Sequence, residues 1–219
     1  MINFLKEFPR DAADYISSHT APEDTLLQEL TRTTHLHAMQ ARMLAGHVQG
    51  KFLEFISKMI APSNILEIGT FTGYSAICLA KGLTSGGTLH TIDINDELRY
   101  IAEDFVGRAT AGDKIKLYTG DALEIIPQMD MMFDLVFIDG DKKEYTAYYN
   151  LVIEKVKTNG YIIADNVLWS GKVLDKNVKS NDRCTLELMA FNDFVQNDSR
   201  VENLLLPVRD GMMIIRVIN

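Results

Sequence analysis

The chain has 219 residues, of which 47% are hydrophobic and 24% charged, values typical of one α/β domain with a buried core. It contains no run of about 18 apolar residues, which excludes a transmembrane helix. Its formal net charge of −8 argues against a broad nucleic-acid-binding surface. Because only Cys78 and Cys184 are present, we expect free thiols in a cytoplasmic protein.

The first sixty residues are predicted to form helices. Apolar residues recur at helical spacing in TLLQELTRTTHLHAMQ (25–40) and again in VQGKFLEFISKMI (48–60). Pro62 then ends the second helix. We therefore interpret the chain as a single domain, 1–219, in which a helical extension, 1–60, precedes an α/β core, 61–219.

From Asn64 onwards, short apolar runs alternate with helix-like segments. The runs are NILEIG, TLHTID, KIKLYTG, FDLVFIDG and GYIIADN. This alternation predicts a parallel sheet with helices on both faces. Residues 168–182 are polar and unpatterned, which predicts a long loop. The C-terminal RVENLLLPVRDGMMIIRVIN reads as a hairpin that turns at Asp210 and Gly211. The prediction is a mostly parallel seven-stranded sheet with an antiparallel C-terminal strand.

Three strand ends in the first half of this sheet suggest a nucleotide-like pocket, because ligands bind beyond the carboxyl ends of parallel strands. Gly69 permits a tight turn, but Phe71 occupies the position where a dinucleotide fingerprint needs a second glycine. The sequence therefore disfavours NAD or FAD and favours an adenosine ligand without a pyrophosphate. Asp93 has the spacing of a ribose-binding carboxylate, and Asp121 with Ala122 can flank an adenine. Asp121 can equally be a helix cap.

Two later strands, in FDLVFIDGDK and GYIIADN, end in hard oxygen donors. Asp139, Asp165 and Asn166 offer two carboxylates and an amide, which suit Mg²⁺ or a similar cation. Lys142 follows three residues after the first aspartate. Simpler alternatives remain open, since Lys142 can be a solvated helix residue and Asp165 with Asn166 can form a turn.

The motifs ILEIGTFTGYS, TIDIN, FIDGDK and IADNVLWSG together resemble those of class I S-adenosylmethionine (SAM) methyltransferases. More narrowly, the chain resembles the metal-dependent catechol and caffeoyl-CoA O-methyltransferases, from about Met43 to the C-terminus. The resemblance implies a Rossmann-like fold. It also implies a set of SAM-contacting residues, namely Met43, Ala45, Glu67, Gly69, Ser75, Asp93, Asp121, Ala122 and Asp139.

By the same resemblance, Asp139, Asp165 and Asn166 would bind Mg²⁺ or another divalent cation such as Ca²⁺ or Mn²⁺. A phenol has a pKa of about 10, and a bound cation lowers it, so that neighbouring hydroxyls of a catechol-like acceptor can be methylated. Lys142 and Asp139 would be catalytic, with Lys142 either taking the proton or stabilising the oxyanion. Trp169 would cover the acceptor ring.

Other interpretations fit the same residues. A tRNA 5-hydroxyuridine acceptor is possible through a basic patch at Lys172, Lys176, Lys179 and Arg183. A non-catalytic SAM-binding protein is a third, although it would not need a lysine beside a metal. The resemblance also implies a homodimer and assigns no role to Gln49, since relatives often carry an acidic residue in that segment.

Overall fold

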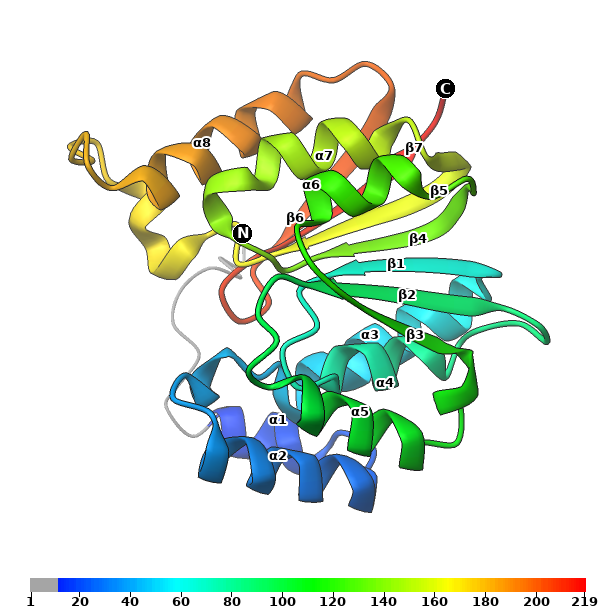
Figure 1. Cartoon of the computed structure of the whole chain (residues 1–219). Helices are drawn as coiled ribbons and strands as arrows, with labels where there is room; N and C mark the ends of the chain where they lie inside the picture. The colour runs from blue at the N-terminus through cyan, green and yellow to red at the C-terminus, as the bar shows by residue number, and fades with distance from the viewer. Residues whose placement is uncertain (1–11) are drawn as a thin grey trace.

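The computed structural model describes residues 12–219. A seven-stranded sheet lies between two layers of helices (Figure 1). The strands are β1 (Asn64–Ile68), β2 (Thr88–Asp93), β3 (Ile115–Thr119), β4 (Phe133–Ile138), β5 (Val156–Asp165), β6 (Val201–Leu206) and β7 (Met212–Val217). The α-helices are α1 (Ala12–Ser18), α2 (Thr25–His37), α3 (Gly46–Ile60), α4 (Tyr74–Ala80), α5 (Arg99–Arg108), α6 (Ala122–Ile125), α7 (Tyr145–Ile153) and α8 (Arg183–Gln196).

The sheet has the order β3-β2-β1-β4-β5-β7-β6. Strands β1 to β5 pair in parallel, whereas β7 is antiparallel to both β5 and β6. The prediction of a mostly parallel sheet with an antiparallel C-terminal strand is therefore confirmed. Every helix within residues 12–219 is too short or too polar to cross a lipid bilayer.

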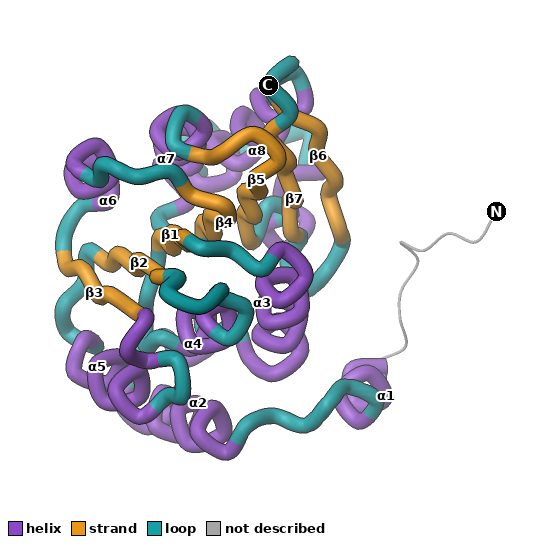
Figure 2. Tube along the Cα trace, turned by 90° about the vertical axis from the view of Figure 1, so that its right-hand side faces the viewer, coloured by secondary structure: helices purple, strands orange, loops and turns teal. Residues whose placement is uncertain are grey.

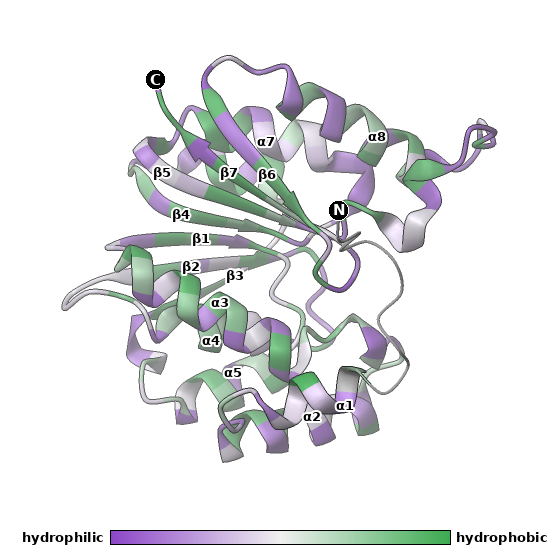
Figure 3. Cartoon of the chain, turned by 180° about the vertical axis from the view of Figure 1, so that it is seen from behind, coloured by the Kyte–Doolittle hydropathy of each residue, from purple (hydrophilic) through white to green (hydrophobic). Residues whose placement is uncertain are grey.

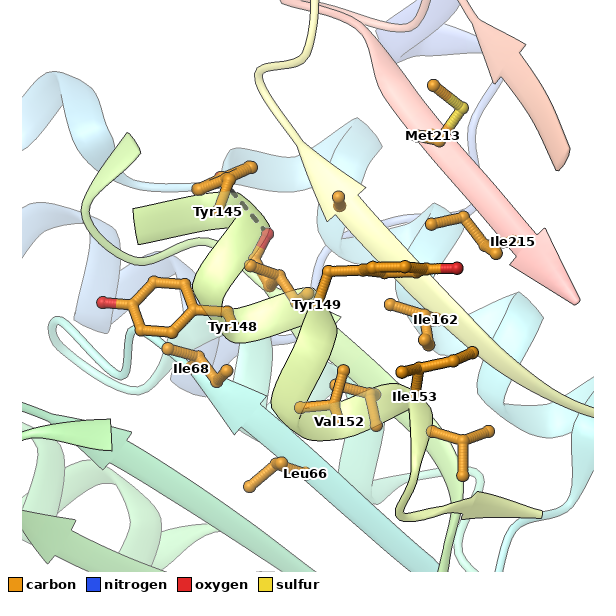
Figure 4. Packing of buried hydrophobic residues seen from close by; sticks show 14 of the residues in the cluster. Leu66, Ile68, Tyr145, Tyr148, Tyr149, Val152, Ile153, Ile162, Met213 and Ile215 are labelled. Atoms are coloured by element: carbon orange, nitrogen blue, oxygen red, sulfur yellow. Dashed lines mark hydrogen bonds between the residues drawn. The ribbon is translucent and has the colours of Figure 1, made fainter. Parts of the chain in front are cut away.

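Side chains alternate between the two faces of the sheet, as the period of a strand requires. On β1, Leu66 and Ile68 face the layer of α6, α7 and α8, and Ile65 belongs to the opposite apolar layer. Figure 4 shows Tyr149 and Val152 of α7 pointing into the first of these layers. Figure 2 shows α6, α7 and α8 on one side of the sheet and α3, α4 and α5 on the other, and in Figure 3 the helices carry both hydrophobic and hydrophilic residues, as amphipathic helices do.

The structure differs from the elements predicted from the sequence in two places. The apolar run GYIIADN predicts a strand that begins at Gly160, but β5 begins at Val156, because this residue pairs with Phe133 of β4. The predicted loop 168–182 contains a short 3₁₀ stretch, Trp169–Leu174, in which Ser170 and Gly171 adopt left-handed backbone angles. The polar composition of this loop gave no sign of those turns.

Candidate active site

The register of the parallel strands brings five strand ends to one edge of the sheet. Ile68 pairs with both Ile92 and Ile138, and Ile138 pairs with Ala164. Asp93 pairs with Thr119 on the outer side. The loops that follow these strands carry most of the predicted site residues, so the sheet brings together what the sequence separates.

The loop after β1 needs glycine at its first position. Gly69 has a φ of +106°, and a Cβ there would overlap the backbone carbonyl of Asp139. At the same place, Asp139 N–H donates a hydrogen bond to the Ile68 carbonyl at 2.8 Å and joins the ends of β4 and β1. Gly69 therefore lets the ends of β1 and β4 approach closely, which brings the predicted SAM loop next to the predicted metal ligands.

Asp93 fixes the far side of this loop. Its Oδ2 accepts a hydrogen bond from Phe71 N–H at 2.7 Å, and its Oδ1 accepts one from Asn95 N–H at 2.9 Å. A small hollow adjoins it, lined by residues that include Phe71, Asn95, Arg99 and Thr119. Arg99 also donates to the Thr119 hydroxyl. Sequence reasoning missed Arg99 and Thr119, because neither stands in a recognisable motif.

Glu67 is fully buried beneath the loop. Its Oε2 accepts a hydrogen bond from the Thr91 hydroxyl at 2.5 Å, whereas Oε1 has no partner within residues 12–219. Burial raises the pKa of Glu67 to about 8, and the charges of Asp139 and Asp93 add to the shift. An unsatisfied buried carboxyl oxygen fits a site that receives a hydrogen-bond donor from a ligand.

The remaining residues predicted to contact the cofactor differ in burial and in their hydrogen bonds. Asp121 caps α6 by accepting from Leu123 N–H at 2.8 Å, which confirms its alternative reading as a cap. Ala122 and Ser75 are buried at the starts of α6 and α4. Met43 is 58% exposed. The cofactor contacts of these residues and of Ala45 stay predictions.

Asp139 and Asp165 occupy equivalent positions on neighbouring strands, since each comes one residue after the paired residues Ile138 of β4 and Ala164 of β5. Asn166 comes next and has a left-handed φ of 59°. Burial, together with the charge of Asp139, raises the pKa of Asp165 to about 6. Within residues 12–219, no three His, Cys, Asp or Glu side chains are grouped so that they could hold a metal ion. The predicted ligand set differs from such a group because its third member is the amide of Asn166.

Lys142 lies against the first of these carboxylates. Its Nζ is 2.7 Å from Asp139 Oδ1 and also donates to the Gly140 carbonyl at 3.1 Å. Burial lowers the pKa of Lys142, but the neighbouring Tyr145 and Asp139 raise it more, and the net shift is upward. These surroundings hold Lys142 in its charged form. Asp141, two residues beyond Asp139, caps the next turn by accepting a hydrogen bond from Lys143 N–H.

Gln49 and Arg209 are part of this site although the sequence gave neither a role. Gln49 Nε2 donates to Asp165 Oδ2 at 2.5 Å, and Gln49 Oε1 accepts from Arg209 Nη1 at 2.5 Å. Arg209 lies on the turn between β6 and β7, and 160 residues separate it from Gln49. No local motif can signal a contact of that range.

Trp169 begins the 3₁₀ stretch after β5 and packs partly against the apolar layer of α7 and α8. Its Nε1 is buried without a partner within residues 12–219. Lys172 Nζ lies 5.8 Å from the centre of its ring. Lys172 also pairs with Asp182 at 3.9 Å, so one cation of the predicted basic patch is already partnered.

A larger, open hollow lies elsewhere, where α8 ends and β6 begins, beside Phe194, Asp198 and Arg200. Because β6 runs in the same direction as β5, its first residue lies at the opposite edge of the sheet from Asp139. This hollow is separate from the strand-end site.

Comparison with known proteins matches the chain to one family over most of its length. A family model described as O-methyltransferase matches residues 16–218. A catechol O-methyltransferase of Niastella koreensis is 33% identical over 88% of this chain and 87% of its own. Caffeoyl-CoA O-methyltransferase 1 of Eucalyptus globulus is 35% identical over 88% and 82%. The crystal structure of an O-methyltransferase from Bacillus cereus in complex with SAH is 32% identical, covers 94% of this chain and 96% of its own, and has a TM-score of 0.84.

Proposed function

We propose, on the premise that the chain belongs to the O-methyltransferase family, that it uses a divalent cation to methylate a vicinal dihydroxy aromatic compound. Family membership makes it a SAM-dependent O-methyltransferase of the catechol and caffeoyl-CoA type. The cation and the acceptor class are what the proposal adds. It rests on one observation, the position of Asp139 and Asp165 at neighbouring strand ends with Lys142 bonded to Asp139.

The side chains at this edge fit a hard cation. Asp139, Asp165 and Asn166 provide oxygen ligands only, which Mg²⁺ prefers, and Ca²⁺ or Mn²⁺ also accepts them. The charge of Asp139 contributes to the raised pKa of Asp165, and a cation would relieve that repulsion. When bound, the cation would supply the positive charge that favours the ionised form of an acceptor hydroxyl.

The chain's own residues would then hold the two substrates. Gly69 lets the donor loop lie close to Asp139, and Asp93 would bind the ribose of SAM. Lys142 Nζ, anchored 2.7 Å from Asp139 Oδ1, would place a positive charge near the acceptor oxygen. Trp169 would cover the acceptor ring. Fixing donor and acceptor in line would supply much of the remaining rate.

The acceptor class follows from the relatives and from the proposed ligands. The two curated relatives are named for catechol and for caffeoyl-CoA, both of which carry adjacent hydroxyls. Two adjacent oxygens can share one cation, whereas a monophenol offers one. We therefore expect catechols to be methylated and matched monophenols to be left unchanged.

The test is methyl transfer from SAM to a catechol before and after treatment with EDTA. We expect chelation to abolish most activity and added Mg²⁺ to restore it. Asp139→Asn should behave like the chelated enzyme, whereas Asp141→Asn, which changes an exposed capping carboxylate two residues away, serves as the matched control. Full activity in EDTA, or in the Asp139 variant, would contradict the proposal.

The same assay discriminates a tRNA acceptor. A tRNA that carries 5-hydroxyuridine and no methoxyuridine would replace the catechol, and its nucleosides would be analysed by mass spectrometry. We expect the small phenol to be methylated and the tRNA to remain unchanged. Methylated uridine without catechol turnover would favour the tRNA alternative, and SAM binding without either product would favour a binding protein.

We further propose that the chain forms a homodimer through its N-terminal helices. On α3, Phe55 and Met59 are 56% and 78% exposed and stand four residues apart, so they share one face of the helix. Soluble monomers rarely leave such residues clustered in solvent. Light scattering coupled to gel filtration would measure the mass, and Phe55→Glu with Met59→Glu should yield the mass of one chain.

A further inference from the structure

Gln49 is a buried polar residue whose amide nitrogen and amide oxygen are each hydrogen-bonded to a charged neighbour. It lies on α3 and is 1% exposed. Its Nε2 donates to Asp165 Oδ2, and its Oε1 accepts from Arg209 Nη1, both at 2.5 Å. A buried amide with both ends hydrogen-bonded is held in one orientation.

The chemistry of the two partners decides which way this amide points. A guanidinium can only donate hydrogen bonds, so the amide oxygen must face Arg209. The amide nitrogen must then face Asp165, whose ionised carboxylate can only accept. Arg209 thus determines that Gln49 presents a donor to the carboxylate.

Both oxygens of Asp165 are held by donors from different parts of the fold. Oδ2 accepts from Gln49, and Oδ1 accepts from Asn166 N–H at 2.8 Å. Two donors on opposite oxygens fix the rotation of the carboxylate plane. Each oxygen keeps a further lone pair for another ligand.

Arg209 itself is anchored to the segment that precedes Gln49. Its Nη1 also donates to the Ala45 carbonyl and, at 3.3 Å, to the Leu44 carbonyl. Arg209 has a left-handed φ of 50°, a conformation that favours glycine, so the side-chain contacts rather than the backbone account for an arginine here.

We propose that Gln49 is a positioning residue that orients the Asp165 carboxylate for a divalent cation, and that Arg209 fixes the sense of the Gln49 amide. This inference rests on the proposed role of Asp165 as a metal ligand. Partners that orient a ligand typically change metal affinity by about 10- to 100-fold when removed. Gln49 and Arg209 would therefore set cation affinity without touching the cation.

The experiment measures Mn²⁺ binding to the SAM-free protein, by the loss of the free-Mn²⁺ EPR signal. Gln49→Met keeps the side-chain length and removes both hydrogen bonds, and we expect a Kd about 10- to 100-fold higher than that of the wild type. Ser57→Ala is the matched control, because Ser57 is buried on the same helix and its hydroxyl bonds to the Leu79 carbonyl. It should lower the unfolding midpoint and leave the Kd unchanged.

Arg209→Gly provides the second variant. It removes the guanidinium at an exposed turn where glycine suits the backbone, so the protein should fold and its Kd for Mn²⁺ should rise by about threefold or more. If Arg209 acts through Gln49, the double variant should bind Mn²⁺ no more weakly than Gln49→Met alone.

The outcomes separate this inference from the proposed function. Wild-type affinity in Gln49→Met, or in Arg209→Gly should the first variant not fold, overturns the inference while the metal site stands. Lowered unfolding midpoints with unchanged Kd values indicate a purely structural role and also overturn it. A wild-type protein that does not bind Mn²⁺ overturns the metal site and the inference together.

Discussion

Replacing Glu67 by glutamine should stabilise the protein at neutral pH, because the wild-type carboxyl is buried with one oxygen unpaired. Burial raises the pKa of Glu67 from its ordinary 4.5 to about 8. At neutral pH the folded protein therefore keeps Glu67 protonated, while the unfolded chain ionises it. Glutamine presents the same acceptor and donor as the protonated acid, so it mimics the folded state without the titration.

The size of the effect follows from the difference between the two pKa values. Below pH 4.5 both states are protonated, and Glu67 costs nothing. As the pH rises from 4.5 towards 8, the unfolded chain gains stability by ionising, and each pH unit is worth about 1.4 kcal/mol. At pH 7 the accumulated cost is about 3 kcal/mol, against less than about 1 kcal/mol at pH 5.

Urea unfolding at pH 5 and pH 7 measures this difference. We expect Glu67→Gln to exceed the wild type by about 2 kcal/mol more at pH 7 than at pH 5. Glu103→Gln removes one exposed carboxyl and is the control for the change in net charge. A stability difference between Glu67→Gln and the wild type that is equal at both pH values would refute the reasoning, because it would mean that Glu67 ionises alike in both states.

Three further predictions concern stability. Burial raises the pKa of Glu54, but three lysines outweigh burial and hold the pKa at about 2. Glu54→Gln should therefore lower the free energy of unfolding by about 2–3 kcal/mol at pH 6. Urea titrations should show that this difference disappears as the pH falls from 4.5 to 2. Gly69→Ala should destabilise by about 2 kcal/mol or more, measured by the urea midpoint, because its Cβ would overlap the Asp139 carbonyl at a positive φ. Phe191→Ala should cost about 3–5 kcal/mol by the same measurement without altering Mn²⁺ affinity, since the ring is fully buried on the α7 face.

The sequence predicted the fold and the location of the site because both follow from local patterns. Alternating apolar runs and amphipathic segments leave few arrangements other than a parallel sheet covered on both faces. In that geometry the residues that end consecutive strands must share one edge. The sequence therefore predicted that Asp93, Asp139 and Asp165 stand at one edge of the sheet, although 72 positions separate the first from the last.

Contacts that depend on loop geometry had no comparable signal. Arg209 reaches Gln49 only because the turn between β6 and β7 adopts a left-handed angle and lies over the start of α3. Neither residue belongs to a periodic pattern. The 3₁₀ stretch at Trp169 likewise depends on Ser170 N–H donating to Asp210 on that turn, a contact between distant segments.

The carboxyl groups of the site share an electrostatic consequence. Asp139 raises the pKa of both Glu67 and Asp165, and within residues 12–219 Lys142 is the only cation that pairs with Asp139 itself. Such an edge is destabilised by its own charge, yet it attracts cations. Both proposed ligands, the sulfonium of SAM and a divalent metal, are positive. The repulsion that weakens the free protein is thus the same interaction that would favour binding, so variants that relieve it should gain stability and lose affinity together.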